Sequence, residues 1–175
     1  LELKKYKASL FYGENLGIKN DLKENIKKKD KEVEIINFFQ EEILKNPDVI
    51  LNEVQNISLF NNKKIIFLNN ISDKFYEQIN TILDYNKEYE VYLFSEILDK
   101  KSKLRNLFEK EKNLATIPCY KDNLKTLEYY VLNALKGYKG LDRRLISLII
   151  SNSNLDRDII KNEIGKIKSC FQDGI

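Results

Sequence analysis

The sequence predicts an α/β fold: a five-stranded parallel sheet with flanking helices, followed by a small all-helical domain. Five short apolar runs alternate with amphipathic helical segments, as in folds built from strand–helix–strand units. The runs are apolar throughout rather than at every second residue, which is typical of parallel strands buried on both faces. After residue 119 the strands stop and amphipathic helices follow. We therefore expect a domain boundary there, with domains at 1–119 and 120–175.

The spacing of apolar residues predicts each element in turn. Residues 18–29, for example, place Ile18, Leu22 and Ile26 four apart, on one stripe of a helix. In residues 73–85, Phe75, Ile79 and either Ile82 or Leu83 are expected to face the core. The predicted strands are 8–13, 32–39, 63–70, 90–96 and 113–119. The predicted helical segments of the first domain are 18–29, 40–46, 46–56, 73–85 and 99–112. Those of the second domain are 123–137, 140–152 and 154–171.

Composition is that of an ordinary soluble globular protein, with 42% hydrophobic and 33% charged residues. The net charge is only +3 and arginine is scarce, which argues against autonomous binding to DNA. The two basic runs, 23–31 and 99–105, are interpreted as solvated surface, with contact to DNA phosphates as the alternative.

Several classes of site are disfavoured. The chain has no histidine, which removes most zinc sites and the commonest general base, so we expect no metal, no cofactor and no catalytic residues. No apolar run approaches the ~20 residues that span a bilayer, and no signal peptide is visible. Cys119 and Cys170 have no metal-binding spacing and are interpreted as buried free thiols of a cytoplasmic protein, with a disulfide as the alternative. Because the chain lacks methionine, we expect it to be part of a longer product.

The first strand–turn–helix lies where a nucleoside triphosphatase carries its phosphate loop, yet the pattern is degenerate. The working loop has four residues between its glycines, then Lys and a hydroxyl residue. Here three residues separate Gly13 from Gly17, Ile18 precedes Lys19, and Asn20 stands where the hydroxyl is needed. The run 63–70 also ends in two asparagines instead of an acidic pair. We interpret Lys19 as a solvated lysine near the helix start, with a phosphate contact as the alternative.

Residues 55–60, "QNISLF", place bulky apolar side chains between polar flanks. Ile57, Leu59 and Phe60 could fold back onto the neighbouring strand as core. Alternatively, apolar side chains at a helix end can fill a pocket on another protein.

Several stretches together resemble the delta subunit of the bacterial DNA polymerase III clamp loader. They are "LFYGENLGIK", "NEVQNISLFNNKKIIFLNN", "LDKKSKLRNLFEK" and "KNEIGKIK", in that family's order across nearly the whole chain. The resemblance implies an AAA+-like module, in which a RecA-like domain (1–119) carries the clamp-binding element and a helical lid domain (120–175) follows. A third, collar domain of the family is absent from this chain.

The resemblance also implies a function. Delta subunits open the ring-shaped sliding clamp (the beta subunit) without hydrolysing ATP, as non-catalytic partners of the loader's ATPase subunits. The subunit is thus no enzyme on its own, although it belongs to a DNA-directed DNA polymerase holoenzyme, a nucleotidyltransferase, and could contact DNA in the assembled complex. Matched to this sequence, the clamp-binding residues are Ile57, Leu59 and Phe60, flanked by Gln55 and Ser58. Two alternatives remain open: a degenerate nucleotide-binding enzyme or nucleotide sensor, and a nucleic-acid-binding module.

Overall fold

The computed structural model describes residues 3–28, 33–55, 64–85 and 89–171. The segment Gln55–Phe60, on which the predicted clamp-binding element falls, therefore lies outside the described residues from position 56 onward, and the side chain of Gln55 is also not described. The chain divides into two compact units, Leu1–Tyr120 and Lys121–Ile175. Each unit is described separately below.

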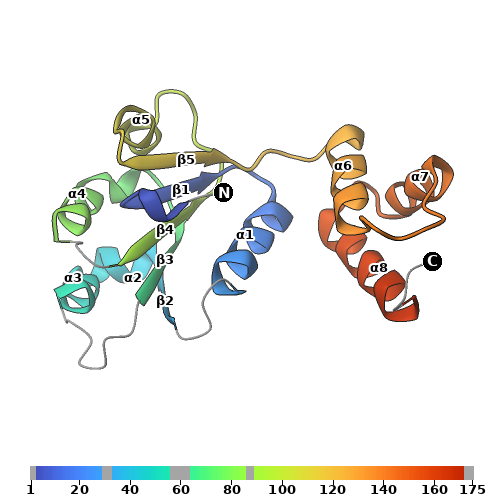
Figure 1. The fold of residues 1–175 in the computed structure, drawn as a ribbon. Helices are drawn as coiled ribbons and strands as arrows, with labels where there is room; N and C mark the ends of the chain where they lie inside the picture. The colour runs from blue at the N-terminus through green and yellow to red at the C-terminus, as the bar shows by residue number, and fades with distance from the viewer. Residues whose placement is uncertain (1–2, 29–32, 56–63, 86–88, 172–175) are drawn as a thin grey trace. The chain divides into compact units, whose positions relative to one another are not determined.

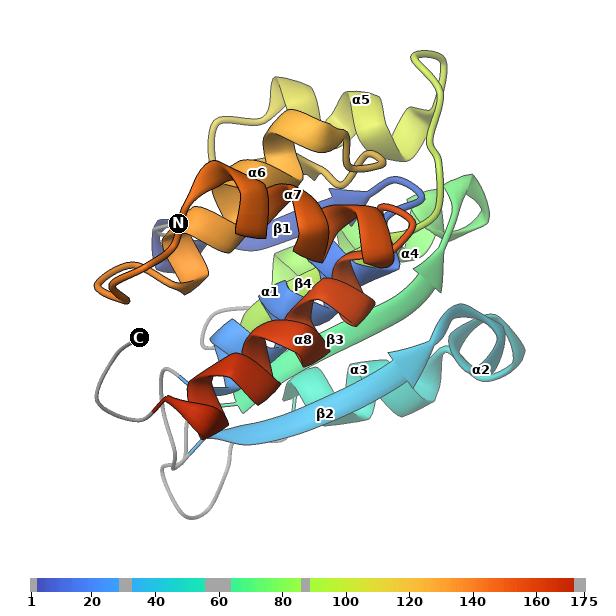
Figure 2. The ribbon, with the colours of Figure 1, turned by 90° about the vertical axis from the view of Figure 1, so that its right-hand side faces the viewer.

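The first unit contains a five-stranded sheet in the order β2-β3-β4-β1-β5, and every neighbouring pair is parallel. Figure 2 shows β2 and β3 side by side with their arrowheads pointing the same way. The predicted fold class, a RecA-like parallel sheet with flanking helices, is therefore confirmed. The strands are β1 (Ala8–Tyr12), β2 (Glu34–Phe39), β3 (Lys64–Ile71), β4 (Glu90–Ser95) and β5 (Leu114–Pro118).

The helices cover the two faces of the sheet unequally (Figure 1). One face packs against side chains from α2 (Gln40–Lys45), α3 (Asp48–Gln55), α4 (Tyr76–Tyr85) and α5 (Lys103–Lys110). The inward positions expected in 73–85 are confirmed on this face, since Phe75, Ile79 and Ile82 are all at most 1% exposed. The 3-10 helix η2 (Asp73–Phe75) lies between β3 and α4.

The other face is covered by α1 (Leu16–Lys28) and the 3-10 helix η1 (Leu3–Lys5). Its core is aromatic, because Phe11, Phe67, Tyr92 and Phe94 project from three adjacent strands. The Phe94 ring lies 5.1 Å from Phe11 and 5.5 Å from Phe67, between ring centroids. Edge-to-face and offset contacts at this separation add to the burial energy of the rings.

The second unit consists of three helices, α6 (Leu124–Ala134), α7 (Arg143–Asn152) and α8 (Arg157–Cys170). Each begins at a side-chain cap, provided by Asn123, Asp142 and Asp156, which accept hydrogen bonds from backbone amides of the first turn. Their apolar stripes meet in one core: Leu127, Val131, Leu135, Ile146, Ile149, Ile150, Ile160 and Ile164.

The start of one helix and the exposure of one cysteine are among the details that differ from the sequence-based expectations. The helix expected over 99–112 begins only at Lys103, because Ser102 caps it and Asp99 forms a local turn in which its carboxylate accepts from the Lys101 amide. Cys119 is buried as expected, but the prediction is wrong for Cys170, which is exposed near the end of α8. In the described residues, no helix is long and apolar enough to cross a membrane.

Candidate functional site: the phosphate-loop position

The turn between β1 and α1 is closed tightly against the end of β5. Gly13 has φ of 135°, and a Cβ built on it would lie 2.2 Å from the carbonyl oxygen of Cys119. Only glycine fits here, because this backbone conformation is rare for other residues and no space remains for a side chain. The amide of Cys119 donates to the Tyr12 carbonyl, and the Cys119 carbonyl accepts from the Asn15 amide.

The start of α1 is satisfied by its own residues. Asn15 accepts a hydrogen bond from the Ile18 amide through its side chain and donates through its Nδ2 to the Tyr120 carbonyl. Its carbonyl accepts from the Lys19 amide. A helix start attracts phosphate through its unpaired amides. Here protein atoms take the amides of Asn15, Ile18 and Lys19, so these three are not available to a phosphate.

Lys19 is buried, which corrects the interpretation of it as solvated. The side chain is 6% exposed, and Nζ donates to the carbonyl oxygens of Gly13 (2.9 Å) and Ser95 (3.1 Å). It thus joins the carboxyl ends of β1 and β4. Burial lowers the pKa of Lys19, while its electrostatic interactions with Cys119, Glu96 and Glu14 act in the opposite direction.

The remaining residues of the degenerate loop do not converge on a common point. Gly17 is buried within the first turn of α1, whereas Asn20 is exposed on that helix. Lys23, one turn beyond Lys19, is only half exposed, so the basic run 23–31 is not uniformly solvated as interpreted from the sequence. Its Nζ lies 4.3 Å from the centroid of the Phe94 ring, a cation–π geometry.

At the end of β3, where an ATPase would hold its metal-binding acid, the side-chain amide of Asn69 is engaged in hydrogen bonds with other residues. Asn69 Oδ1 accepts from Lys23 Nζ (2.6 Å), and Nδ2 donates to the Phe38 carbonyl (3.3 Å). The nearby carboxylate of Asp73 is also engaged, because it accepts from the Ser102 hydroxyl and the Leu104 amide at the start of α5. Burial raises the pKa of Asp73, but these hydrogen bonds outweigh it and hold the pKa below its usual value.

The second basic run also contains a packed residue. Arg105 lies with its guanidinium carbon 4.9 Å from the centroid of the Tyr12 ring and donates to Glu109 and to the Leu98 carbonyl. No group of three or more cysteine and carboxylate side chains is close enough to hold a metal ion within the described ranges. At the carboxyl edge of the sheet, meaning the ends of β1, β3, β4 and β5, internal hydrogen bonds thus engage Lys19, Asn69 and Asp73, while the Ser95 hydroxyl is buried without a partner in the described residues.

The predicted clamp-binding segment begins at the opposite, amino-terminal edge of the sheet. The described residues on either side of it are tied together: Lys64, the first residue of β3, donates to Glu53 of α3 and pairs with Glu34 of β2 at 3.9 Å. The hydrogen bond to Glu53 raises the pKa of Lys64. The chain therefore leaves α3 and enters β3 at two fixed points, and Gln55, Ile57, Ser58, Leu59 and Phe60 stay a prediction.

The sequence could have indicated one of these features. Asparagine directly before a helical stripe is a strong capping signal, and Asn15 fits it. The burial of Lys19 had no such signal, because a lysine near a helix start is usually solvated and the two carbonyls that receive it come from strands far apart in the sequence.

Comparison with known proteins supports the fold. A structure of the Bacillus subtilis DNA clamp loader delta protein matches with a TM-score of 0.66 and 15% identity, over 98% of this chain and 56% of that one. A structure described as the structural basis for katanin self-assembly matches with a TM-score of 0.50 and 16% identity, over 81% of this chain and 51% of that one. No family model matches, and no curated protein sequence matches.

These matches define the class of fold: an AAA+-like arrangement in which a RecA-like unit is followed by a helical unit. In particular, the fold resembles that of the clamp loader delta protein. The match with that protein covers 98% of this chain. The chain spans little more than half the length of that protein.

Proposed function

We propose that this chain is the clamp-opening part of a replication clamp loader, a protein that binds the sliding clamp and does not hydrolyse ATP. The observation that carries the proposal is the combination of a delta-like fold with a phosphate-loop position filled by Lys19. A fold that in other proteins holds a nucleotide here has its polar groups committed to one another, which favours a role in binding over one in catalysis.

The clamp would be bound by Ile57, Leu59 and Phe60, with Gln55 and Ser58 as flanking polar contacts. Transferring leucine and phenylalanine from water into a pocket contributes about 1.5–3 kcal/mol each. A ligand shifts a ring from closed to open only as far as it binds the open form better. No catalytic group is needed for such a shift. The ion pair of Lys64 with Glu53 joins the start of β3 to α3, the two elements that flank the proposed clamp-binding residues in the sequence.

The remaining parts of the proposal concern the assembly. Partners would be the sliding clamp (beta subunit) and the ATPase and other subunits of the loader, within a DNA polymerase III holoenzyme in the cytoplasm. ATP hydrolysis in neighbouring subunits would move this domain to present or withdraw the element. Contact with DNA would occur inside the assembled complex.

The test measures binding of this chain to the sliding clamp of the same organism, beside the double variant Leu59→Ala, Phe60→Ala. We expect micromolar binding that the double variant weakens by about a hundredfold or more, since two buried side chains contribute at least about 3 kcal/mol together. The matched control is Leu16→Ala, Ile97→Ala, which truncates two bulky apolar side chains of the same unit that are 66% and 65% exposed. This control should bind normally.

Circular dichroism and thermal melting of each variant separate binding from folding. If the double variant of residues 59 and 60 unfolds, these side chains belong to the core and the proposed element is wrong. If the intact chain does not bind the clamp, the proposed function is wrong. Magnesium-dependent ATP affinity would favour a nucleotide sensor, and strongly salt-dependent affinity for DNA a nucleic-acid-binding module.

A further inference from the structure

The boundary between the two units falls within a short stretch of chain whose two ends are attached to different units. The first unit ends at Tyr120, and the second begins at Lys121. Residues 119–123 form neither helix nor strand and connect β5 to α6. The freedom of the units to reorient therefore depends on which residues of this stretch are held by contacts within their own unit.

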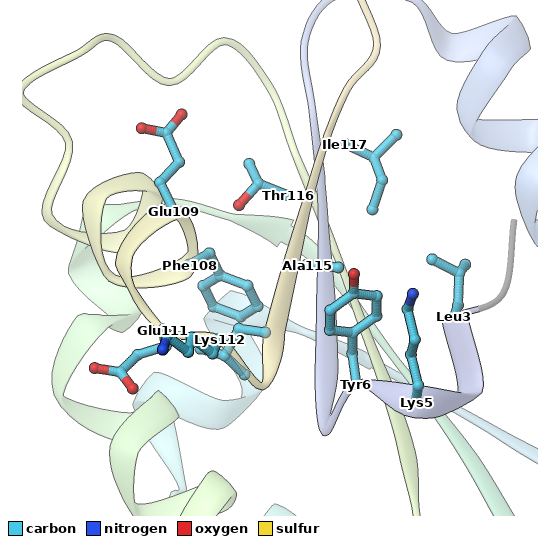
Figure 3. Close-up of a pocket in the computed structure, with 11 residues that line it drawn as sticks. Leu3, Lys5, Tyr6, Phe108, Glu109, Glu111, Lys112, Ala115, Thr116 and Ile117 are labelled. Atoms are coloured by element: carbon cyan, nitrogen blue, oxygen red, sulfur yellow. The ribbon is translucent and has the colours of Figure 1, made fainter.

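Strand β5 leads into this stretch and is held along one edge. In the described residues β5 pairs only with β1, and its other edge borders a groove of about 500 Å³ that residues of η1 and α5 also line (Figure 3). The Asn113 carbonyl and both backbone groups of Cys119 bond toward β1 and the turn after it. Since alternate residues of a parallel strand face the same neighbour, Thr116 faces the groove. The sheet thus holds the chain as far as Cys119.

Tyr120 continues the attachment to the first unit through both its backbone and its ring. Its carbonyl accepts a hydrogen bond from Nδ2 of Asn15 at 3.1 Å, and the hydroxyl oxygens of Tyr120 and Tyr12 lie 3.0 Å apart. The two tyrosine rings meet edge to face, with 5.9 Å between their centroids. Because the carbonyl and the far end of the ring are both held, Tyr120 moves with the sheet.

Asp122, two residues further along the chain, is attached to the second unit. Its carboxylate accepts hydrogen bonds from Nε and Nη2 of Arg157, both at 2.8 Å, and from the Thr126 hydroxyl at 2.7 Å. The side chain of Asp122 is 3% exposed and that of Arg157 14%. The guanidinium carbon of Arg157 also lies 4.2 Å from the centroid of the Tyr130 ring. A bidentate pair of this kind fixes geometry as well as charge, so Asp122 moves with the helices.

Lys121 alone separates these two attachments. It is exposed, and within the described part of the chain no hydrogen bond, ion pair or ring contact of Lys121 is found. Asn123, on the far side of Asp122, already belongs to the cap of α6, in which it exchanges hydrogen bonds with Thr126.

We propose that the joint between the two units is confined to one residue, Lys121, and that the pair of Asp122 with Arg157 sets this limit. The units reorient by rotation about the backbone bonds of residue 121. Release of the pair extends the free stretch from Lys121 to the α6 cap at Asn123. Because each attachment lies within a single unit, the joint operates whatever partner the chain binds.

The first test is digestion of the whole chain by a lysine-specific protease under native conditions. Proteolysis requires local opening of the chain around the bond that is cut, so the bond after Lys121 should resist while both neighbours are attached. Arg157→Gln breaks the pair without changing the residues around that bond. We expect cleavage after Lys121 to become about tenfold faster or more, because two charge-assisted hydrogen bonds no longer oppose opening.

The matched control is Arg144→Gln, which makes the same change at an exposed arginine of α7. Its cleavage rate should stay within about twofold of the wild type. Unchanged cleavage in Arg157→Gln, or rapid cleavage after Lys121 in the wild type, overturns the proposal.

A second measurement keeps the test decisive if Arg157→Gln unfolds the second unit. Spin labels on the exposed Cys170 and on Lys110→Cys, an exposed position of α5, report the distribution of distances between the units, and Cys119 is buried and stays unlabelled. Lys121→Pro changes none of the attached side chains but fixes rotation at the one free residue, so the distribution should become about twofold narrower.

Lys121→Ala is the control for the proline variant, because it removes the same side chain and keeps the rotation. Its distribution should match that of the wild type. If Lys121→Pro gives a distribution as broad as that of Lys121→Ala, the movement arises at other residues and the proposal is wrong.

Discussion

The carboxyl edge of the sheet and the outer edge of β5 differ in whether their polar groups have hydrogen-bond partners. At the carboxyl edge, strand-end carbonyls are bonded by Lys19, and the side chains of Asn69 and Asp73 are committed to neighbours. At the outer edge, Thr116 turns its backbone groups into a groove where no strand of the described residues pairs with it. Buried polar groups without partners cost free energy. The polar groups just named at the carboxyl edge have partners, although the Ser95 hydroxyl there is buried without one in the described residues, whereas the backbone groups of Thr116 have no strand beside them in those residues.

The largest effect is expected from Gly13→Ala, which breaks the closed region. The new Cβ would lie 2.2 Å from a backbone oxygen, and alanine would be strained at φ 135°. Overpacking and backbone strain together should cost about 3 kcal/mol or more. Urea denaturation measures the loss.

The matched control is Gly165→Ala in α8, where a Cβ added to the glycine would meet nothing within 4 Å. Alanine in a helix interior stabilises by about 0.8–1 kcal/mol over glycine, so the sign should be opposite. A Gly13→Ala protein as stable as the wild type would show that the turn is not closed against Cys119.

The next effect concerns Lys19→Met, which keeps the aliphatic stem and removes the donor. The carbonyls of Gly13 and Ser95 lose their shared partner, which should cost about 1–3 kcal/mol of unfolding free energy. ATP affinity should not appear in this variant, because the amides of Asn15, Ile18 and residue 19 remain bonded within the protein. Isothermal calorimetry checks this, and magnesium-dependent ATP binding would contradict it.

The pH dependence of the difference in unfolding free energy between the wild type and Lys19→Met is a second readout. The pKa of Lys19 is lower in the folded protein than its usual value of 10.5, so the unfolded chain binds the proton more tightly. Stability of the wild type relative to Lys19→Met should therefore rise as pH increases from the lowered pKa toward 10.5. The amine keeps donors for both carbonyls after it loses its proton. A difference that shrinks with rising pH would contradict the burial of the charge.

Sequence patterns captured what depends on local periodicity. The strand–helix alternation and the inward positions Phe75, Ile79 and Ile82 follow from burial, and burial on both faces of a parallel sheet leaves a clear apolar signal. The defective phosphate loop could also be recognised, because its glycine spacing is a local property of residues 13–20.

The patterns failed where contacts join distant strands. Lys19 is predicted to be solvated because it lies near the start of a helix. Its ammonium group instead donates a hydrogen bond to Ser95, which is 76 residues away in the sequence. The exposure of Thr116 at an outer edge depends on the strand order, which the apolar runs do not encode. Closure of one edge and openness of the other are therefore properties of the assembled sheet.

The smallest effect, Thr116→Val, sharpens the comparison most directly. Its hydroxyl is buried without a partner in the described residues, so replacing it by a methyl group should change stability by less than about 0.5 kcal/mol, or raise it. The matched control is Ser102→Ala, whose hydroxyl donates to Asp73 and accepts from the Arg105 amide; its loss should cost about 1 kcal/mol. Urea denaturation of both variants is the measurement. If Thr116→Val proves as costly as Ser102→Ala, the outer edge is as fully satisfied as the carboxyl edge, and the contrast between the two regions fails.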